Sequence, residues 1–307
     1  LSIATLIGFM SATVYSVLVC GAAGQLGNEL RETCPDHVEL VSRDREQLDI
    51  TDPDAIARVL DETGARRIVN AAAYTAVDHA EHDSHRAHRV NAEAPGLLAA
   101  AAAARGLRIL QVSTDFVFDG RQSHPYQPTD TPNPLGVYGA SKLQGEQRVL
   151  ESGADALILR TGWVYSRHGG NFVKTMLKLM AEREQLTIVE DQMGSPTWAR
   201  GLATVCWDLL FEPCALGIYH WSDSGVCSWF DLAAGTRALA LELGLVKRAA
   251  KLLPIPAAQY STPAARPLYS VLDKSSTRAV LGYAGEHWHI QLRSMLTDLK
   301  NTINSGE

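Results

Sequence analysis

The stretch CGAAGQLGNEL, residues 20–30, spaces Gly21, Gly24 and Gly27 as GxxGxxG between an apolar run and a helical pattern. Glycines in such a turn permit a tight bend and let backbone N–H groups approach a pyrophosphate at the positive end of the helix. A plain strand-to-helix turn is the alternative, because a glycine triplet by itself is a weak signal. Its place, at the first strand–helix junction of an alternating chain, favours a dinucleotide site.

The alternation is between short apolar runs and helical patterns. The runs that we expect to be strands lie at residues 14–20, 38–42, 66–70, 107–113, 156–160 and 186–189. Short runs that are apolar on both faces, with helices between them, are typical of buried parallel strands joined by crossovers. Asp52 and Pro53 predict the start of a helix, and Gly64 and Gly106 predict helix ends. We therefore expect an α/β fold, a Rossmann-type doubly wound parallel sheet.

The alternation weakens after about residue 165, where prolines and aromatic residues gather instead. We predict a dinucleotide-binding core over residues 14–165 and a smaller C-terminal substrate-binding lobe over residues 166–307, interleaved with returning segments of the core. Residues 1–13 are interpreted as an N-terminal extension. Since position 1 is not Met and Met10 directly precedes the first strand, residues 1–9 are expected to lie upstream of a start at Met10.

The composition limits the classes of partner. In 307 residues, 46% apolar and 20% charged side chains are typical of a globular enzyme. A formal charge of −6, without a basic stripe, argues against nucleic acid as the main partner. The apolar N-terminus lacks a positive flank and runs on into the glycine turn, which argues against a signal peptide or a membrane segment. Five scattered cysteines without a CxxC pair predict a reducing cytoplasm, no disulfide framework and no zinc site.

The loop after the second run carries two residues with opposite implications for the cofactor. Asp44 is placed to bind a ribose hydroxyl, as in NADH, whereas Arg43 is placed to accept the 2′-phosphate of NADPH. Asp49 and Ile50 follow where a loop often lines the adenine, although an Asp before a helix is equally a cap. The choice between the two cofactors stays open.

The reacting groups are predicted at the end of the fourth run and at the start of the following helix. Ser113, Thr114 and Asp115 stand at the carboxyl end of a strand, where ligands of parallel sheets bind. In VYGASKLQGE, residues 137–146, Tyr138 and Lys142 are four apart and so share one helix face. An ammonium group near a phenol lowers its pKa from the usual value of about 10, whereas the alternative is a surface tyrosine beside a solvated lysine.

These features together resemble the extended short-chain dehydrogenase/reductase superfamily. Longer segments resemble the dTDP-4-dehydrorhamnose reductase family: NAAAYTAVDHAE (70–81), STDFVFDG (113–120), PYQPTDTPNPLGVYGASKLQGE (125–146), RTGWVY (160–165), NFVKTML (171–177), DQMGSPT (191–197) and ARPLYSVLD (265–273). The resemblance implies NADPH- or NADH-dependent reduction of the C4 ketone of dTDP-4-dehydro-L-rhamnose to dTDP-L-rhamnose, for surface polysaccharides. We also expect a cytoplasmic monomer or homodimer, without nucleic acid or membrane partners.

The resemblance further implies roles for single residues. Tyr138 donates the proton to the C4 oxygen, Lys142 lowers the pKa of Tyr138 and holds the ribose, and Thr114 bonds the developing alkoxide. Asp115, Trp163 and Arg266 contact the substrate, with Arg266 on the diphosphate; a surface ion pair is an equal alternative for that arginine. The residues implied to bind the cofactor are Gly21, Gly24, Gln25, Leu26, Gly27, Arg43, Asp44, Asp49, Ile50, Ala73, Tyr74, Thr75, Tyr138 and Lys142.

The chain departs from the family pattern at Phe116, where the family usually has tyrosine. The family resemblance alone suggests a bound magnesium ion. Glu190 and Asp191 lie near the expected region, but adjacent carboxylates are usually solvated or capping, so we predict no metal ligand. The histidines spaced by three in DHAEHDSHRAHR also rotate around a helix rather than converge on a metal.

Three other functions are considered. A nucleotide-sugar 4,6-dehydratase is disfavoured, because Phe116 replaces the second acid that dehydratases place after the strand-four threonine. Another nucleotide-sugar 4-ketoreductase, or an epimerase that retains its cofactor, would use the same fold. A non-catalytic nucleotide-binding regulatory subunit is the alternative of another class.

Overall fold

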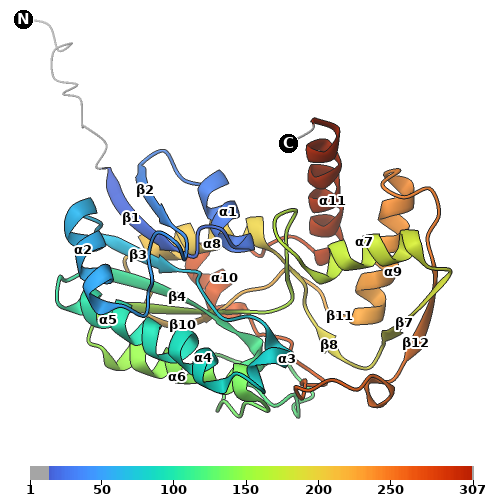
Figure 1. Ribbon diagram of the computed structural model, residues 1–307, viewed down its shortest axis with the longest axis horizontal. Coiled ribbons are helices and arrows are strands. Elements are labelled where there is room, and N and C mark those ends of the chain that lie inside the picture. The colour runs from blue at the N-terminus through green and yellow to red at the C-terminus, as the bar shows by residue number, and fades with distance from the viewer. Residues whose placement is uncertain (1–13, 306–307) are drawn as a thin grey trace, which may run out of the picture.

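A six-stranded parallel sheet lies at the centre of the protein, which is described here from a computed structural model over residues 14–305 (Figure 1). The expectations for residues 1–13 lie outside the described residues. The sheet order is β10-β5-β4-β3-β1-β2, and every neighbouring pair is parallel. Its strands are β1 (Tyr15–Cys20), β2 (Val38–Arg43), β3 (Arg67–Asn70), β4 (Arg108–Thr114), β5 (Asp155–Thr161) and β10 (Gly217–His220). The predicted α/β fold with a doubly wound sheet is confirmed.

Both faces of the sheet are covered by helices, because successive side chains of a strand point to opposite faces. Val17 and Val19 of β1 pack in one cluster with α1 (Gln25–Glu32) and α8 (Ala199–Phe211). Leu18 and Cys20 pack in the other cluster. The helices of this second face are α2 (Pro53–Thr63), α5 (Ala94–Ala103) and α6 (Val137–Glu151). This burial on both faces explains why the strands read as continuous apolar runs.

The predicted boundaries of α2 are confirmed in atomic detail. Asp52 is its N-cap, and its carboxylate accepts hydrogen bonds from the N–H groups of Asp54 and Ala55 at 2.9 and 3.3 Å. Gly64 ends the helix in the left-handed conformation with φ 61°, which glycine adopts without the Cβ penalty of other residues.

The run at residues 186–189 is a strand but does not belong to the central sheet. It forms β7 (Gln185–Val189), which pairs in parallel with β12 (Lys251–Ile255). The sixth central strand is instead β10, from a segment whose prolines and aromatic residues predict loops. Four residues that include Tyr219 and His220 give no apolar run, yet they pair with β5 at the sheet edge.

The helical stretch that ends in the alanine run at residues 99–104 consists of three pieces. These are α4 (Ser84–His88), a π-helical turn η2 (Arg89–Glu93) and α5. Pro95 explains the widened turn, because proline has no N–H to donate to the carbonyl of Asn91 four residues earlier. The same carbonyl lies so close to Gly145 of α6 that a side chain there would collide with it.

The second lobe forms around two further apolar clusters. Its helices and strands are α7 (Phe172–Glu182), β8 (Met193–Gly194), β11 (Cys227–Ser228), α9 (Trp229–Glu242) and α11 (Trp288–Ser305), together with β7 and β12. The remaining elements are α3 (Val77–Ala80), η3 (Asp115–Val117), β6 (Val164–Tyr165), β9 (Thr197–Trp198), η4 (Ala257–Gln259) and α10 (Ser275–Leu281). Because α8 and β10 return to the core after residue 166, we keep the interleaved division into residues 14–165 and 166–307 as a proposal.

Within residues 14–305, no helix combines the length and the apolar character that a membrane span requires.

Candidate active site

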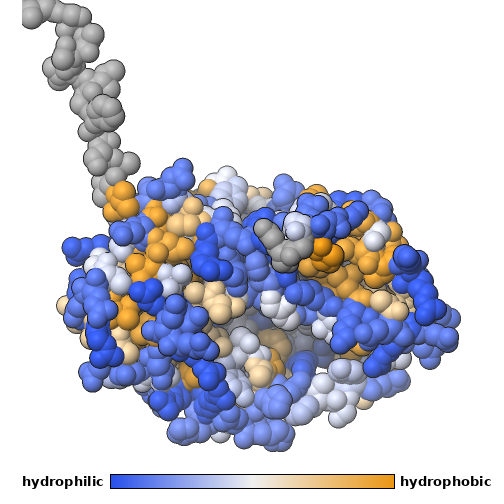
Figure 2. All heavy atoms as spheres, turned by 45° about the horizontal axis from the view of Figure 1, so that its top comes forward, coloured by the Kyte–Doolittle hydropathy of each residue, from blue (hydrophilic) through white to orange (hydrophobic). Residues whose placement is uncertain are grey.

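A cavity of about 910 Å³ opens at the carboxyl ends of the central strands. The chain leaves β1 toward β2 on one side and returns at β3 on the other, and open parallel sheets bind ligands at such a reversal. The volume lies in the range of ligand pockets, and the molecule is visibly hollowed near the middle of the face in Figure 2. The residues singled out from the sequence that line it are Gly21, Gly24, Gln25, Leu26, Asp44, Asp49, Ile50, Ala73, Tyr74, Thr75, Ser113, Thr114, Asp115, Phe116, Tyr138, Lys142 and Trp163. Gly27, Arg43 and Arg266 do not line it.

The glycine turn has the geometry of a pyrophosphate cradle. Gly21 has φ 86°, and a Cβ there would come within 2.7 Å of the backbone nitrogen of Ala72. Gly27 cannot carry a side chain either, because the Gly21 carbonyl lies against it; this glycine lets α1 pack on the turn that follows β1. Gly24 is the N-cap of α1 without a side-chain cap, so the helix presents its N–H groups to the cavity wall.

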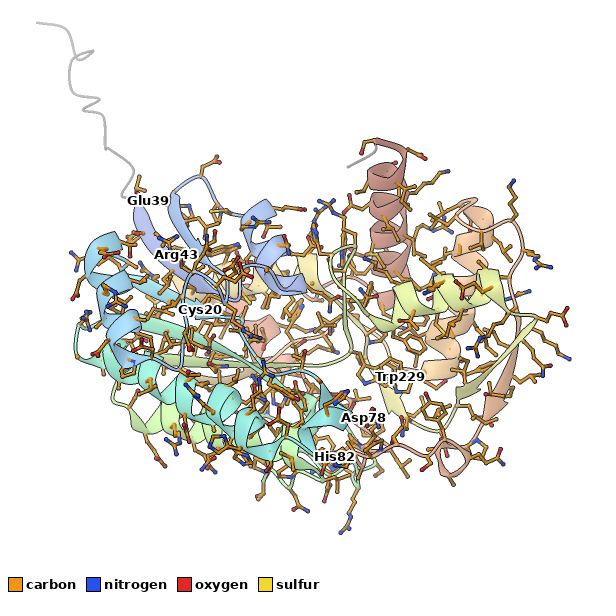
Figure 3. The ribbon with its side chains drawn as sticks, viewed as in Figure 1. Cys20, Glu39, Arg43, Asp78, His82 and Trp229 are labelled. Carbon is orange, nitrogen blue, oxygen red and sulfur yellow. The ribbon has the colours of Figure 1, made fainter. Side chains whose placement is uncertain are left out.

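Of the two residues expected to choose between NADH and NADPH, Asp44 lines the cavity and Arg43 does not. Arg43 is the last residue of β2 (Figure 3), and its guanidinium donates to the carbonyl of Ser42 at 3.1 Å. The Asp44 carboxylate accepts from the N–H groups of Glu46 and Gln47 at 2.9 and 3.0 Å, so it also closes its own turn. Arg45, which the sequence analysis missed, lines the cavity instead.

Two more arginines of the cavity wall were missed. Arg89 of η2 donates to the Thr51 hydroxyl at 2.8 Å, and Arg86 of α4 lies over the Tyr74 ring at 5.6 Å. Both belong to the histidine-rich stretch DHAEHDSHRAHR, residues 78–89, whose pattern gave no sign of cofactor binding.

The start of α6 brings Tyr138 to the end of β4. Gly139 packs so tightly on the Phe116 carbonyl that no side chain fits there. The Phe116 and Tyr138 rings meet edge to face with 5.7 Å between centroids. Lys142, only 4% exposed, donates to the carbonyl of Val112 at 2.6 Å. The structure thus gathers Thr114, Tyr138 and Lys142 at one wall of the cavity.

The acid–base properties of this wall differ from the sequence-based expectation in one respect. Removal of the phenol from water raises the pKa of Tyr138 to about 12, and the interaction with Thr114 only partly opposes this. The expected lowering by Lys142 is therefore absent in the protein alone, where the ammonium is turned to the Val112 carbonyl. Burial lowers the pKa of Lys142 to about 8, against the opposing charge of Glu146. Tyr138 is consequently a neutral phenol near pH 7, the form that can give up a proton.

Asp115 is buried directly beside these groups. Burial raises the pKa of its carboxyl to about 6, against hydrogen bonds from Ser270 and Thr114. The Thr114 hydroxyl donates to Asp115 Oδ1 at 3.1 Å. The hydroxyl of Ser113, 4% exposed, has no partner among the described residues. An unpartnered buried hydroxyl on a cavity wall, together with the glycine cradle, fits a bound nicotinamide dinucleotide.

An ion pair behind Lys142 was also missed. Glu146, one turn further along α6, accepts three hydrogen bonds from Arg160 of β5, at 2.9 and 3.2 Å from Nε and at 2.7 Å from Nη2. Both side chains are 2% exposed. The spacing of four between Lys142 and Glu146 was the available signal, since it puts both on the same face as Tyr138.

Arg266 forms the ion pair that was weighed as the alternative to phosphate binding. Its Nη2 lies 2.7 Å from the Asp78 carboxylate, which also accepts from the N–H of Ala264. Asp78 belongs to α3, just after the loop of Tyr74 and Thr75 (Figure 3). A contact of Arg266 with the diphosphate stays a prediction.

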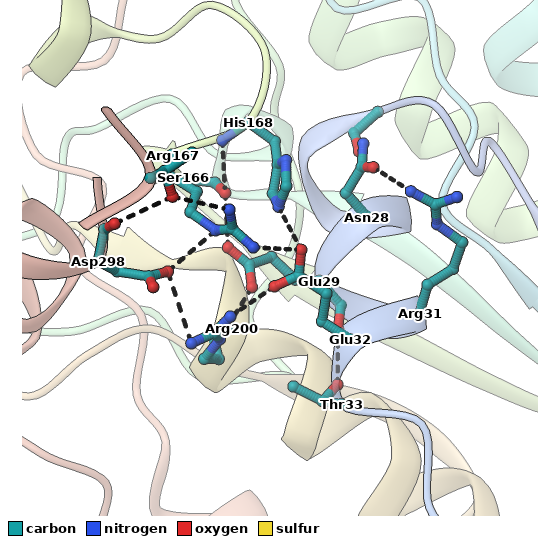
Figure 4. Close-up of polar contacts among 12 residues, drawn as sticks. Asn28, Glu29, Arg31, Glu32, Thr33, Ser166, Arg167, His168, Arg200 and Asp298 are labelled. Carbon is teal, nitrogen blue, oxygen red and sulfur yellow. Dashed lines mark hydrogen bonds and ion pairs between the residues drawn. The ribbon is translucent and has the colours of Figure 1, made fainter. Parts of the chain in front are cut away.

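The only group of described residues with metal-ligand geometry is Glu29, Glu32 and His168 (Figure 4). Its carboxylate oxygens are already occupied. Glu29 accepts from Ser166 at 2.6 Å and from Arg200 at 3.0 Å, and Glu32 accepts from Arg167, Arg200 and His168. Because two guanidinium groups neutralise the carboxylates, this group does not fit a magnesium ion.

Comparisons with known proteins agree on one family. The sequence profile described as "RmlD substrate binding domain" matches residues 15–301. A dTDP-4-dehydrorhamnose reductase of Burkholderia thailandensis is 40% identical over 295 residues, covering 92% of this chain and 98% of its own length. The solved reductase of Bacillus anthracis str. Ames in complex with NADP superposes with a TM-score of 0.87 at 34% identity, over 93% and 99% of the two chains. The Clostridium acetobutylicum reductase gives 0.88 at 36% identity over the same shares.

Proposed function

This chain belongs to the family of dTDP-4-dehydrorhamnose reductases, and we propose that Thr114, Tyr138 and Lys142 carry out its reaction. The protein is an oxidoreductase that reduces the C4 ketone of dTDP-4-dehydro-L-rhamnose to dTDP-L-rhamnose at the expense of NADPH or NADH. The observation that carries this conclusion is the meeting of the three side chains at one wall of a dinucleotide-sized cavity. In a chain so similar to the reductases, that arrangement favours the same chemistry.

The reaction adds a hydride to the carbon of the ketone and a proton to its oxygen. When bound, the reduced nicotinamide supplies the hydride for the C4 carbon. The Tyr138 hydroxyl supplies the proton for the C4 oxygen, and its high pKa keeps that proton in place near neutral pH. The Thr114 hydroxyl, one residue beyond Ser113, supports the oxygen as negative charge develops.

Lys142 is proposed to act on both the proton donor and the cofactor. Its ammonium is anchored on the Val112 carbonyl and has further N–H donors for a ribose hydroxyl. Being buried, it can also stabilise the phenolate that Tyr138 becomes after proton transfer. Solvent then restores the proton to Tyr138, which closes the cycle with no net change in the enzyme.

The nucleotide-sugar end of the cavity is proposed to lie at Asp115 and Trp163. The cofactor is proposed to bind along the turn of Gly21 and Gly24 and the small side chains before Tyr74. Arg45 and Arg89 add positive charge at the wall next to Thr51. Such charge suits the 2′-phosphate of NADPH better than the free hydroxyl of NADH.

The test follows the absorbance of reduced nicotinamide with the 4-keto nucleotide sugar supplied enzymatically. Wild type should consume the cofactor in step with the sugar and give a product heavier by two hydrogens. Tyr138→Phe should lower kcat about 10²- to 10⁴-fold, the usual contribution of a general acid. Tyr260→Phe, at a tyrosine 57% exposed, is the matched control. A retained cofactor with an isomerised sugar would indicate an epimerase, and no turnover at all would indicate a regulatory subunit.

We also propose a cytoplasmic protein that works as a monomer or homodimer. All five cysteines are free thiols, which suits a reducing compartment. Sedimentation equilibrium across a range of concentrations tests the oligomeric state, and a species larger than a dimer would contradict it.

A further inference from the structure

Trp163 has an unusual backbone conformation at the edge of the cavity. Its φ of 52° makes it the one non-glycine residue with positive φ among residues 14–305. L-residues disfavour this region because the Cβ crowds the following carbonyl. The preceding Gly162 is also constrained, since a Cβ there would lie 2.6 Å from the Asp115 carboxyl group. Thr197 holds this segment from the backbone side, because its N–H donates to the Trp163 carbonyl at 3.2 Å and its hydroxyl donates to the Gly162 carbonyl at 2.7 Å. The contacts of the Trp163 side chain add a second restraint.

The main contact is a parallel stack of two indoles. The rings of Trp163 and Trp229 lie 3.6 Å apart between centroids, with 3° between their planes. Trp229 is the first residue of α9 (Figure 3), and the Phe172 ring lies 4.7 Å from it. The stack therefore joins the end of β5, in the core, to a helix of the second lobe.

The two supports of Trp163 are themselves fixed. The start of α9 is closed by a capping box, in which Asp231 N–H donates to Ser228 Oγ at 3.0 Å and Ser228 N–H donates to the Asp231 carboxylate at 2.9 Å. At the other edge of the indole, a Cβ on Gly194 would come within 2.5 Å of Trp163 Cε2. Gly194 pairs with Cys227 across β8 and β11, so one small unit of the lobe presents both contacts.

Only one indole of the stack faces the ligand. Trp163 lines the cavity, whereas Trp229 does not. We infer that Trp229 is a positioning residue: by its stack on Trp163 it fixes the indole that bounds the sugar end of the cavity. The inference rests on the proposed function, in which a 6-deoxyhexose occupies that end. A flat apolar ring suits the C–H face and the methyl group of such a sugar, provided that the ring is held in one orientation.

The test separates positioning from general packing of the lobe, to which both indoles also belong. Trp229→Leu should raise KM for the nucleotide sugar about 3- to 10-fold, the value of one aromatic pair. KM for NADPH should change much less, because Trp163, the indole that Trp229 supports, is proposed to bound the sugar end of the cavity. Trp229→Phe keeps a ring on Trp163 and should restore most of the sugar affinity. Near-ultraviolet circular dichroism reports the coupled indoles, so Trp229→Phe and Trp163→Phe should abolish the same signal.

Trp288→Phe is the matched control, because Trp288 is 8% exposed in the same apolar cluster and does not line the cavity. It should lower thermal stability without raising KM for the sugar. An unchanged KM for the sugar in Trp229→Leu, with active wild type and a lost indole signal, would overturn the positioning role. The positioning role would also be overturned if Trp229→Leu and Trp288→Phe both raised KM for the sugar and KM for NADPH to the same extent. Wild type that fails to oxidise NADPH would instead overturn the proposed function itself.

Discussion

Asn91 clamps the backbone of Tyr74 from both sides: its Oδ1 accepts from the Tyr74 N–H at 2.8 Å and its Nδ2 donates to the Tyr74 carbonyl at 3.0 Å. Nδ2 also donates to the hydroxyl of Ser141, the neighbour of Lys142, at 3.1 Å. Asn91 is 1% exposed. One buried amide thus links the loop on the cofactor side of the cavity to the helix of the reacting residues.

Asn91→Ala should therefore weaken the cofactor site and the fold together. Leaving the Tyr74 N–H and carbonyl without partners costs about 1–3 kcal/mol for each buried group. We expect a lower free energy of unfolding in urea and a raised KM for NADPH. Asn91→Asp, which accepts but cannot donate, should lie between the alanine variant and wild type. Asn301→Ala, at an exposed position of α11, is the control, and equal effects of Asn91→Ala and Asn301→Ala would refute the clamp.

The Arg160–Glu146 pair predicts a different response to charge removal. Glu146→Gln leaves a buried guanidinium without its counter-ion, which typically destabilises a protein by about 3–5 kcal/mol. Replacement of both, as Glu146→Leu with Arg160→Met, removes the two charges together and should recover most of that loss. Urea unfolding of the single and double variants measures the coupling; equal stabilities of the two would contradict it.

The same pair should affect the pH dependence of activity. Glu146 raises the pKa of Lys142 against the lowering by burial, so its removal lowers the pKa of Lys142 below about 8. The ammonium form is then lost at a lower pH, and the alkaline fall of kcat/KM should move toward neutral pH in the double variant. An unmoved alkaline limb would show that Lys142 does not govern it.

Much of this architecture is predictable from local sequence, because β1 to β5 are buried on both faces and read as apolar runs. The glycine turn is equally predictable, since its residues act through the backbone conformation that glycine allows. The edge strand β10 could not be predicted, because its four residues, Gly217–His220, carry no apolar pattern. The clamp by Asn91 could not be predicted either, because its partner Tyr74 lies 17 residues away in another segment. The pKa of Tyr138 moved against expectation because burial, which depends on the whole fold, outweighs any one neighbouring charge.

Arg45, rather than Arg43, should determine the choice of cofactor. Arg43 ends β2 and does not line the cavity, whereas Arg45 lines it. The Asp44 carboxylate is engaged in its own turn. A charge-assisted hydrogen bond is worth about 1.5–3 kcal/mol, so Arg45→Ala should raise KM for NADPH about 10- to 100-fold. KM for NADH should change little, and Arg43→Ala should leave the ratio of the two unchanged. A preserved preference for NADPH in Arg45→Ala, or its loss in Arg43→Ala, would contradict this assignment.

The buried carboxyl of Asp115 should lower the stability of the protein at neutral pH although activity depends on it. Its carboxyl has a pKa raised to about 6 in the fold, against about 3.9 in the unfolded chain. The folded state therefore binds more protons between these values, and stability falls as pH rises from about 4 to about 6. At pH 7 the full penalty is present, at about 3 kcal/mol by the size of the shift. Asp115→Asn removes it, so this variant should gain stability over wild type at pH 7 and lose the gain near pH 4.

Unfolding curves of wild type and Asp115→Asn across pH 4–8, with Asp36→Asn at an exposed position as control, measure this difference directly. Activity should move the opposite way, because the proposed contact of the Asp115 carboxylate with the substrate is lost. The buried charge would then be retained for the substrate in spite of its effect on folding. A stability difference that does not vary with pH would place the pKa of Asp115 near its ordinary value and remove the argument.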